Sequence, residues 1–322
     1  MAYEGISDFV AVDRAPRRPA PVLKKKRLAF RWYGGKFSHL DWLLPLLPVE
    51  GVHHYCEPFG GSAAVLLNRP PAPIETYNDL DGEVVNFFRV LRDQRGELIE
   101  ALRLTPFSRE EFELACSPPE ENISDLERAR RFFIRAGQVR TGLAQTATIG
   151  RWANCKSTSR SGMSGAVSRW LNQIDRLAEV AERLLRVQIE NRPAIDVIRL
   201  YDDSKTLFYL DPPYVHESRK DTRAYGAEMT EADHRLLAEV LHSVRGMVAI
   251  SGYRCRLMDE LYGDWHRIDA PIKTAHSCKT ARQECLWVNF SVERSCLEHC
   301  TCVDKVVDTV ILRLRDNFGL DI

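Results

Sequence analysis

A carboxylate, two prolines and an aromatic ring follow one another at Asp211-Pro212-Pro213-Tyr214, directly after an apolar segment. Prolines lack a backbone N–H, so this turn is stiff and offers hydrogen-bond acceptors without donors. The Asp211 carboxylate and the backbone carbonyls suit a planar ligand that carries an amino group, with Tyr214 stacked on its ring. The alternative is a rigid turn before a helix. The apolar strand before the turn, and the glycine turn upstream, favour the ligand site.

A second group of chemistry-bearing residues follows the apolar segment 53–56, at Glu57-Pro58-Phe59-Gly60-Gly61-Ser62. The two glycines allow a tight turn and a close approach of the backbone to a ligand. Asp79 follows the next apolar segment and is placed to accept hydrogen bonds from ribose hydroxyls. The chain lacks both GxGxxG and a P-loop lysine, so a nucleoside without a pyrophosphate is favoured over the cofactor of a nucleotide-dependent dehydrogenase.

The elements that position these residues alternate between strand and helix. The sequence predicts strands at 53–56, 74–77, 187–190, 206–210, 247–251 and 284–290, and helices at 63–67, 82–92 and 231–244. Strand, glycine turn, helix and strand form a βαβ unit, which implies a parallel sheet in an α/β fold. Ligands of such sheets bind beyond the carboxyl ends of the strands, where both groups lie. Between them the pattern changes to helices at 108–116, 123–139 and 167–185, with an irregular stretch at 141–165.

The net charge is zero, because 45 Lys and Arg residues balance 45 Asp and Glu residues among 322. The charge is not evenly spread. Two windows, 14–40 and 128–174, each hold nine basic residues and no acidic one, so the remainder of the chain is acidic. The windows fit either a phosphate-contacting surface or a solvated basic face with a disordered tail. A hydrophobic fraction of 44% without a long apolar run predicts a globular protein with no membrane span and no secretory leader.

The chain ends differ in character from its centre. Residues 1–27 mix Pro, Arg and Lys and are expected to be disordered. The nine cysteines have no regular spacing and are expected to be reduced thiols. Cys296, His299, Cys300 and Cys302 match no common metal-site spacing, so we expect no metal there. Residues 303–318 carry a helical apolar stripe, which is more typical of core packing than of a partner interface.

Four motifs together resemble one family. Arg31-Trp32-Tyr33-Gly34-Gly35-Lys36, then Glu57 to Ser62, Asn78-Asp79 and Asp211 to Tyr214 resemble, in the same order, the Dam-type (D12 class) DNA adenine-N6 methyltransferases, in a phage or mobile-element-like form. The resemblance runs from about 29 to 289. It implies a Rossmann-like, S-adenosylmethionine-dependent methyltransferase sheet with a helical target-recognition insert. Two departures stand out: Ala63 replaces a family glycine, and the stretch 190–194 leaves the contact to the cofactor adenine unassigned.

The resemblance implies the following site residues. The catalytic motif is Asp211, Pro212, Pro213 and Tyr214. The cofactor-binding residues are Trp32, Tyr33, Lys36, Phe59, Gly60, Gly61, Ser62, Asp79 and Asp211. The residues expected to face DNA, from the resemblance and the basic windows, are Arg31, Arg140, Arg151, Lys156 and Arg160. The cofactor is S-adenosylmethionine and no metal is expected.

The resulting hypothesis is a site-specific enzyme that methylates N6 of a flipped adenine in duplex DNA. The expected catalytic domain is discontinuous (28–104 and 186–290), with the recognition insert at 105–185 and an unassigned extension at 291–322. The alternatives are a methyltransferase acting on amino groups of RNA or protein, and a catalytically silent DNA-binding relative. We expect a monomer in the bacterial or phage-infected cytoplasm, associated with the nucleoid. A restriction endonuclease of the same system is a candidate partner, and no membrane partner is expected.

Overall fold

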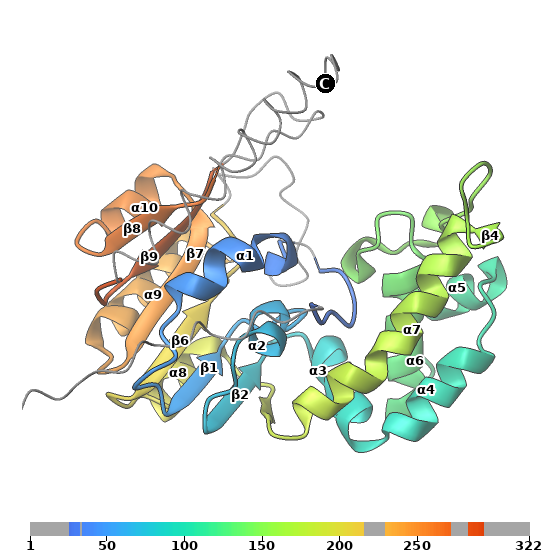
Figure 1. The fold of residues 1–322 in the computed structure, drawn as a ribbon, viewed down its shortest axis with the longest axis horizontal. Helices are drawn as coiled ribbons and strands as arrows, with labels where there is room; N and C mark the ends of the chain where they lie inside the picture. Colours follow the sequence, from blue (N-terminus) through green and yellow to red (C-terminus); the bar gives the residue numbers. More distant parts are fainter. Residues whose placement is uncertain (1–25, 33, 216–228, 272–282, 293–322) are drawn as a thin grey trace, which may run out of the picture.

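The computed structural model describes residues 26–32, 34–215, 229–271 and 283–292. A seven-stranded sheet forms one half of the protein (Figure 1). The strand order is β5 (Gln188–Glu190), β2 (Ile74–Asn78), β1 (His54–Glu57), β6 (Thr206–Leu210), β7 (Met247–Tyr253), β9 (Glu284–Val288) and β8 (His266–Asp269). The first five strands are parallel, and β9 runs antiparallel to both of its neighbours. The predicted α/β fold is therefore confirmed, with a mixed sheet that is parallel over its first five strands.

Every strand of this sheet except β8 was expected from the sequence. The strand β8 has only Ile268 buried among its four residues, so it carries no apolar run that would mark it. Strands β6 and β9, in contrast, are buried throughout, as expected for strands covered on both faces.

The two faces of the sheet bury separate apolar clusters, because neighbouring side chains of a strand point to opposite faces. Leu207 and Tyr209 pack with α1 (Leu40–Leu43), α2 (Ala64–Asn68) and α3 (Gly82–Asp93). Phe208 and Leu210 pack with α8 (Ala194–Leu200), α9 (Glu231–Ser243) and α10 (Arg256–Leu261). Helices thus cover both faces, which leaves the carboxyl edge of the parallel strands for the loops that carry the motifs.

A helical cluster lies beside the sheet and is joined to it through α3 (Figure 1). It comprises α4 (Arg95–Leu104), α5 (Arg109–Cys116), α6 (Asp125–Gln138) and α7 (Gly165–Leu184). The helix α4 was not expected, and it packs on α6 and α7, so the cluster begins before residue 105. A buried ion pair fixes the end of α7 to the sheet: both carboxylate oxygens of Glu75 on β2 lie 2.6 Å from Arg183 nitrogens.

The stretch 141–165 contains local structure. It holds two single turns of 3-10 helix, η3 (Ala144–Thr146) and η4 (Ile149–Arg151), and an exposed hairpin of β3 (Ser159–Arg160) and β4 (Met163–Ser164). Ser161 and Gly162 have φ angles of 51° and 75° and form the tight turn of this hairpin. Two further 3-10 turns, η1 (Lys36–His39) and η2 (Leu44–Leu46), flank α1.

Several expectations lie outside the described residues. They are the disordered tail through residue 25, Tyr33 as a cofactor contact, the cluster Cys296, His299, Cys300 and Cys302, and the helical stripe at 303–318. Among the residues that are described, no helix is both long and apolar enough to cross a membrane.

Candidate active site

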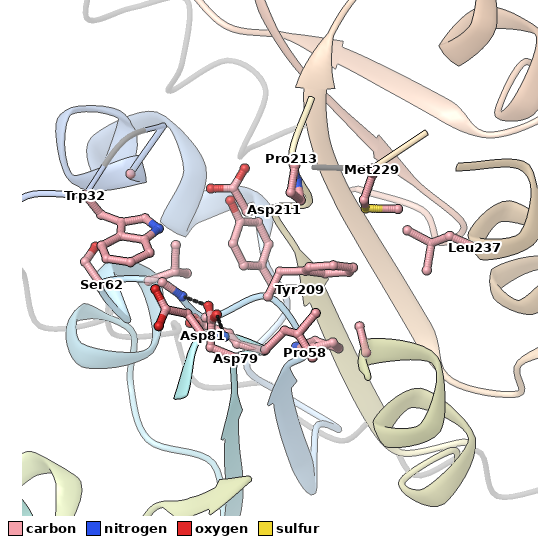
Figure 2. Close-up of a pocket in the computed structure, with 18 of the residues that line it drawn as sticks. Trp32, Pro58, Ser62, Asp79, Asp81, Tyr209, Asp211, Pro213, Met229 and Leu237 are labelled. Carbon is pink, nitrogen blue, oxygen red and sulfur yellow. Dashed lines mark hydrogen bonds between the residues drawn. The ribbon is translucent and has the colours of Figure 1, made fainter. Parts of the chain in front are cut away.

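A cavity of about 600 Å³ lies at the carboxyl ends of β1, β2 and β6. Figure 2 shows Trp32 and Ser62 at one end of it and Met229 and Leu237 at the other. The structure brings most of the predicted residues together here: Trp32, Lys36, Phe59, Gly60, Gly61, Ser62, Asp79, Asp211 and Pro213 all line the cavity. Pro212 and Tyr214 do not line it. Residues that were not singled out from the sequence complete the wall: Leu80, Asp81, Pro193, Ala194, Ile195, Tyr209, Met229, Asp233, Leu236 and Leu237.

The glycine loop after β1 is required by packing inside the protein. A Cβ on Gly60 would lie 2.2 Å from the Tyr77 ring, and a Cβ on Gly61 would lie 2.7 Å from the Trp32 ring. Gly61 also has a φ of 48°, a conformation that favours glycine. The sequence suggested that these glycines allow a ligand to approach the backbone closely. The structure adds a second reason, because larger residues would clash with the Tyr77 and Trp32 rings. Ala63 has a φ of 54°, so the alanine at this family glycine position keeps the left-handed conformation at some cost.

Asp79 lies at the cavity wall beyond β2, held by two backbone donors. Its Oδ2 accepts from the Gly61 N–H at 2.8 Å, and its Oδ1 accepts from the Asp81 N–H at 2.9 Å. Burial raises the pKa of Asp79 to about 6, although these hydrogen bonds favour the ionised form. The carboxylate thus connects the glycine loop to the end of β2 and keeps lone pairs free for a ligand.

Asn191 lies in the stretch after β5, for which the sequence assigned no contact to the cofactor adenine. Its side-chain amide donates to the backbone carbonyls of Asp79 at 2.8 Å and Leu80 at 3.3 Å. Asn191 therefore fixes the loop after β2 and does not line the cavity. The cavity wall in this region is apolar, formed by Pro193, Ala194 and Ile195.

A buried ion pair holds the carboxylate of Asp211. Lys36, which is 2% exposed, directs its Nζ to the Asp211 Oδ1 at 2.5 Å. The same ammonium donates to the Tyr214 hydroxyl at 2.6 Å and to the Gly34 carbonyl at 2.9 Å. An ammonium group has three hydrogens, and these three acceptors use all of them.

Tyr214 is buried, with 5% of its surface exposed. Its ring packs edge-on against Tyr253 at a centroid distance of 4.7 Å. Its hydroxyl accepts from Lys36 and donates to Glu284 Oε1. Tyr214 is thus anchored at its polar end behind the cavity wall, whereas the sequence suggested a ring open to the ligand.

Glu284 is a member of this cluster that the sequence did not reveal. It opens β9, is 5% exposed, and its Oε1 lies 3.4 Å from the Lys36 Nζ. An antiparallel strand begins at the edge where its parallel neighbours end, so the first residue of β9 reaches the same edge as Asp211. The only signal in the sequence was an acidic residue at the start of an otherwise apolar strand.

Burial shifts the proton affinity of the acidic residues at the cavity. Desolvation raises the pKa of Asp211 to about 6, while Lys36 opposes the shift and Glu284 adds to it. Desolvation also raises the pKa of Glu57 to about 8, against the hydrogen bond that its Oε1 accepts from the Tyr55 hydroxyl. Burial would lower the pKa of Lys36, but Asp211 and Glu284 outweigh it and raise that pKa, so the lysine stays charged.

The basic residues expected to face DNA are exposed. Arg140, Arg151, Lys156 and Arg160 lie along the connection between α6 and α7, and Arg31 lies beside Gly142, where a Cβ would be 3.3 Å from Arg31 Cδ. Within the described residues, no ion pair involves any of these five. The α6 half of the same window differs, because its arginines pair with acidic side chains: Arg128, Arg130, Arg131 and Arg135 with Glu83, Glu111, Glu120, Asp125 and Glu127. The available positive charge is therefore smaller than the sequence window suggests.

Comparison with known proteins agrees with this geometry. Residues 32–275 match the family described as D12 class N6 adenine-specific DNA methyltransferase. The chain is 26% identical over 280 residues to the type II methyltransferase M1.LlaDCHI of Lactococcus lactis subsp. cremoris, an alignment that covers 77% of this chain and 91% of the relative. It is 34% identical over 83 residues to the DNA N-6-adenine-methyltransferase of Escherichia phage P1, which covers 26% of this chain and 11% of that protein.

Proposed function

The chain belongs to the D12 class of N6 adenine-specific DNA methyltransferases, and from this premise we propose which of its residues perform the reaction. The enzyme transfers a methyl group from S-adenosylmethionine to N6 of adenine in DNA. The observation that carries the proposed site is the Asp211 carboxylate, which lines the cavity and forms an ion pair with the buried Lys36.

The cavity fits S-adenosylmethionine in size and in the chemistry of its walls. A volume of about 600 Å³ is in the range of small-molecule sites. Asp79 would accept hydrogen bonds from the ribose hydroxyls of the cofactor. Phe59, Leu80 and Ile195 offer apolar surface to the adenine ring of the cofactor. Trp32, Gly60, Gly61 and Ser62 would surround the methionine end. When bound, S-adenosylmethionine supplies the methyl group from its sulfonium.

Asp211 and the carbonyl of Pro212 would accept the two N6 hydrogens of the target adenine. This would aim the nitrogen lone pair at the methyl group, so catalysis comes from position and electrostatics. The base must leave the duplex, since its N6 is otherwise paired and stacked. Pro213 stiffens the turn that holds these acceptors.

We propose that Lys36 positions Asp211, in place of the cofactor contact inferred from the resemblance. Its three hydrogens are already committed to Gly34, Asp211 and Tyr214, so none remains for a ligand. The ammonium also favours the ionised form of Asp211, which is the form that accepts hydrogen bonds. Tyr214 would stack on the flipped base, a contact worth about 1–3 kcal/mol, and its buried ring must become accessible for this.

The helical insert, taken as 105–185 with α4 packed on it, is proposed to recognise the target site, while 28–104 and 186–290 form the catalytic domain. Arg31 and the basic residues between α6 and α7 would contact phosphates, since they are exposed and have no acidic partner among the described residues. Trp32 lines the cavity and approaches Phe132 of α6, with 6.4 Å between ring centroids. The segment 31–32 thus lies next to both the cofactor cavity and the insert.

The replacement Asp211→Asn tests the proposed site. With labelled S-adenosylmethionine, the wild-type chain should label duplex DNA free of adenine methylation, and this variant should not. Both proteins should bind the cofactor and unfold cooperatively, the variant at a lower temperature because it breaks the buried pair with Lys36. An active Asp211→Asn variant would disprove the assignment. Parallel incubations with RNA and with protein test the alternative acceptors, and wild-type cofactor binding without transfer would indicate a silent relative.

The setting of the enzyme is also a proposal. We infer a monomer that acts on nucleoid DNA in the cytoplasm, together with a restriction endonuclease of the same specificity. The support for this partner is the type II methyltransferase name of one relative. Light scattering tests the monomer. Sequencing that detects N6-methyladenine in the DNA of cells that express the chain identifies the recognised site. An endonuclease that cuts at this site then tests whether the methylated DNA is protected.

A further inference from the structure

Glu284 lies beyond the residues that the family match covers, which end at residue 275. Its carboxylate nevertheless contacts two members of the proposed site. Glu284 Oε1 accepts the hydroxyl hydrogen of Tyr214 and lies 3.4 Å from the Lys36 Nζ. It does not line the cavity, so any effect on the reaction must pass through these two neighbours.

The directions of the hydrogen bonds around Tyr214 require an acceptor at the position of Glu284. The Tyr214 hydroxyl has one hydrogen, and it already accepts from the Lys36 ammonium. Its hydrogen must therefore go to an acceptor on the other side, and Glu284 is that acceptor. Without Glu284, this hydroxyl, on a side chain that is 5% exposed, would keep the hydrogen bond from Lys36 but lose the acceptor of its own hydrogen, which is costly.

The backbone holds Glu284 firmly in place. Glu284 pairs with Tyr253 in the β7–β9 ladder, and the backbone carbonyl of Glu284 accepts a hydrogen bond from the Ala270 N–H at 2.8 Å. Tyr253 is also the residue against which the Tyr214 ring packs edge-on. One pair of strand residues thus fixes Tyr214 at both its ring and its hydroxyl.

We propose that Glu284 is a positioning residue of the methyl-transfer site, which holds Tyr214 through its hydroxyl and Lys36 through its charge, and so orients the Asp211-to-Tyr214 turn. The proposal rests on the role given above to Asp211. Because Glu284 does not line the cavity, it would act without touching the substrate or the cofactor.

A double-mutant cycle tests the link to Tyr214. Glu284→Ala should lower kcat about tenfold, whereas adding it to Tyr214→Phe should lower kcat much less, because the bond is already absent. Glu284→Gln keeps an acceptor for the hydroxyl and should retain most of the wild-type kcat at pH 8. Kinetics are measured with labelled S-adenosylmethionine and saturating unmethylated DNA, and KM for the cofactor should change little. Equal losses in both backgrounds would overturn the proposal.

The pH profile provides a readout that a purely structural role would not move. Five titratable groups face Asp211, namely Lys36 at the start of η1, Glu57 on β1, Tyr209 on β6, Tyr214 after β6 and Glu284 on β9. Glu284 raises the pKa of Asp211, so Glu284→Gln should move the acidic limb of kcat to lower pH. An unmoved limb would overturn the proposal, and this test remains decisive if Glu284→Ala does not fold.

The control is Glu260→Gln, which removes an exposed carboxylate paired with Arg235 and should leave both kcat and the acidic limb as in the wild type. Asp211→Asn distinguishes a failure of the role given to Glu284 from a failure of the proposed active site. If it is inactive while the Glu284 variants behave like wild type, only the role of Glu284 fails. If it is active, the proposed site itself is wrong.

Discussion

Lys36 and Asp211 stand 175 positions apart in the chain and meet in a buried ion pair of 2.5 Å at the cavity wall. Lys36 opens the 3-10 turn η1, and Asp211 follows the end of β6. The pair therefore forms only when the amino-terminal segment folds over the edge of the sheet. It couples the folding of this segment to the assembly of the site.

Removal of the cation at this pair should be costly. Lys36→Met leaves the carboxylates of Asp211 and Glu284 buried without their common partner, a change that typically destabilises by about 3–5 kcal/mol. Chemical denaturation measures the loss. Lys26→Met, which removes a partly exposed lysine paired with the exposed Asp41, should cost less than about 1 kcal/mol. Equal losses in the two variants would contradict the buried pair.

Methylation should decline as the solution becomes acidic. The reaction needs Asp211 ionised, and burial raises its pKa to about 6, so kcat should fall as pH drops through about 6. Single-turnover rates across pH 5–9 at saturating DNA test this. A rate that holds to pH 4.5 would mean that Asp211 titrates like an exposed carboxyl or is not needed.

Glu57 should make the free protein less stable at higher pH. Its folded pKa of about 8 lies above its ordinary value, so the folded state holds a proton that the unfolded state has released between these two values. Stability is thereby lost as pH rises toward 8. Glu57→Gln removes this pH-dependent loss of stability. The melting temperature of the variant should therefore rise relative to that of the wild type as the pH increases from 5 to 8. Glu100→Gln, at an exposed position on α4, should show no such trend.

The two glycine positions Gly60 and Gly96 should respond in opposite directions to alanine. Gly60→Ala drives a methyl group into the Tyr77 ring, and such overpacking costs about 1–3 kcal/mol. Cofactor affinity should fall with it, since the loop lines the cavity. Gly96 lies in α4 with open space at its Cβ, and alanine there should add about 0.5–1 kcal/mol. Thermal melts and calorimetric titration with S-adenosylmethionine separate the two effects.

The exposed basic residues should set the salt dependence of DNA binding. The combined change of Arg151, Lys156 and Arg160 to Ala should weaken binding to all sequences and reduce the log–log salt slope by up to about 3. Arg199→Ala removes an exposed arginine on α8, which packs on the sheet face opposite α3, and should leave the slope unchanged. Fluorescence anisotropy from 50 to 300 mM salt measures both. An unchanged slope in the triple variant would place the DNA elsewhere.

The sequence alone determined the order of the motifs, the family resemblance, and most of the strands and helices. These depend on neighbouring residues: the apolar run of β6, the glycines after β1, and the stripe of α9. The Asp211 turn belonged to this local information as well, since its prolines and aromatic ring are consecutive.

Only the tertiary structure decided which charges meet. It paired the arginines of α6 with Glu83 and other acids, left Arg151 and Arg160 exposed without an acidic partner among the described residues, and brought Glu284 to Tyr214. It also showed that Lys36 serves Asp211 and has no hydrogen left for a ligand. The physical reason is that electrostatic and hydrogen-bond partners are chosen by distance in space, and the crossovers of an α/β sheet bring together residues that no local pattern connects.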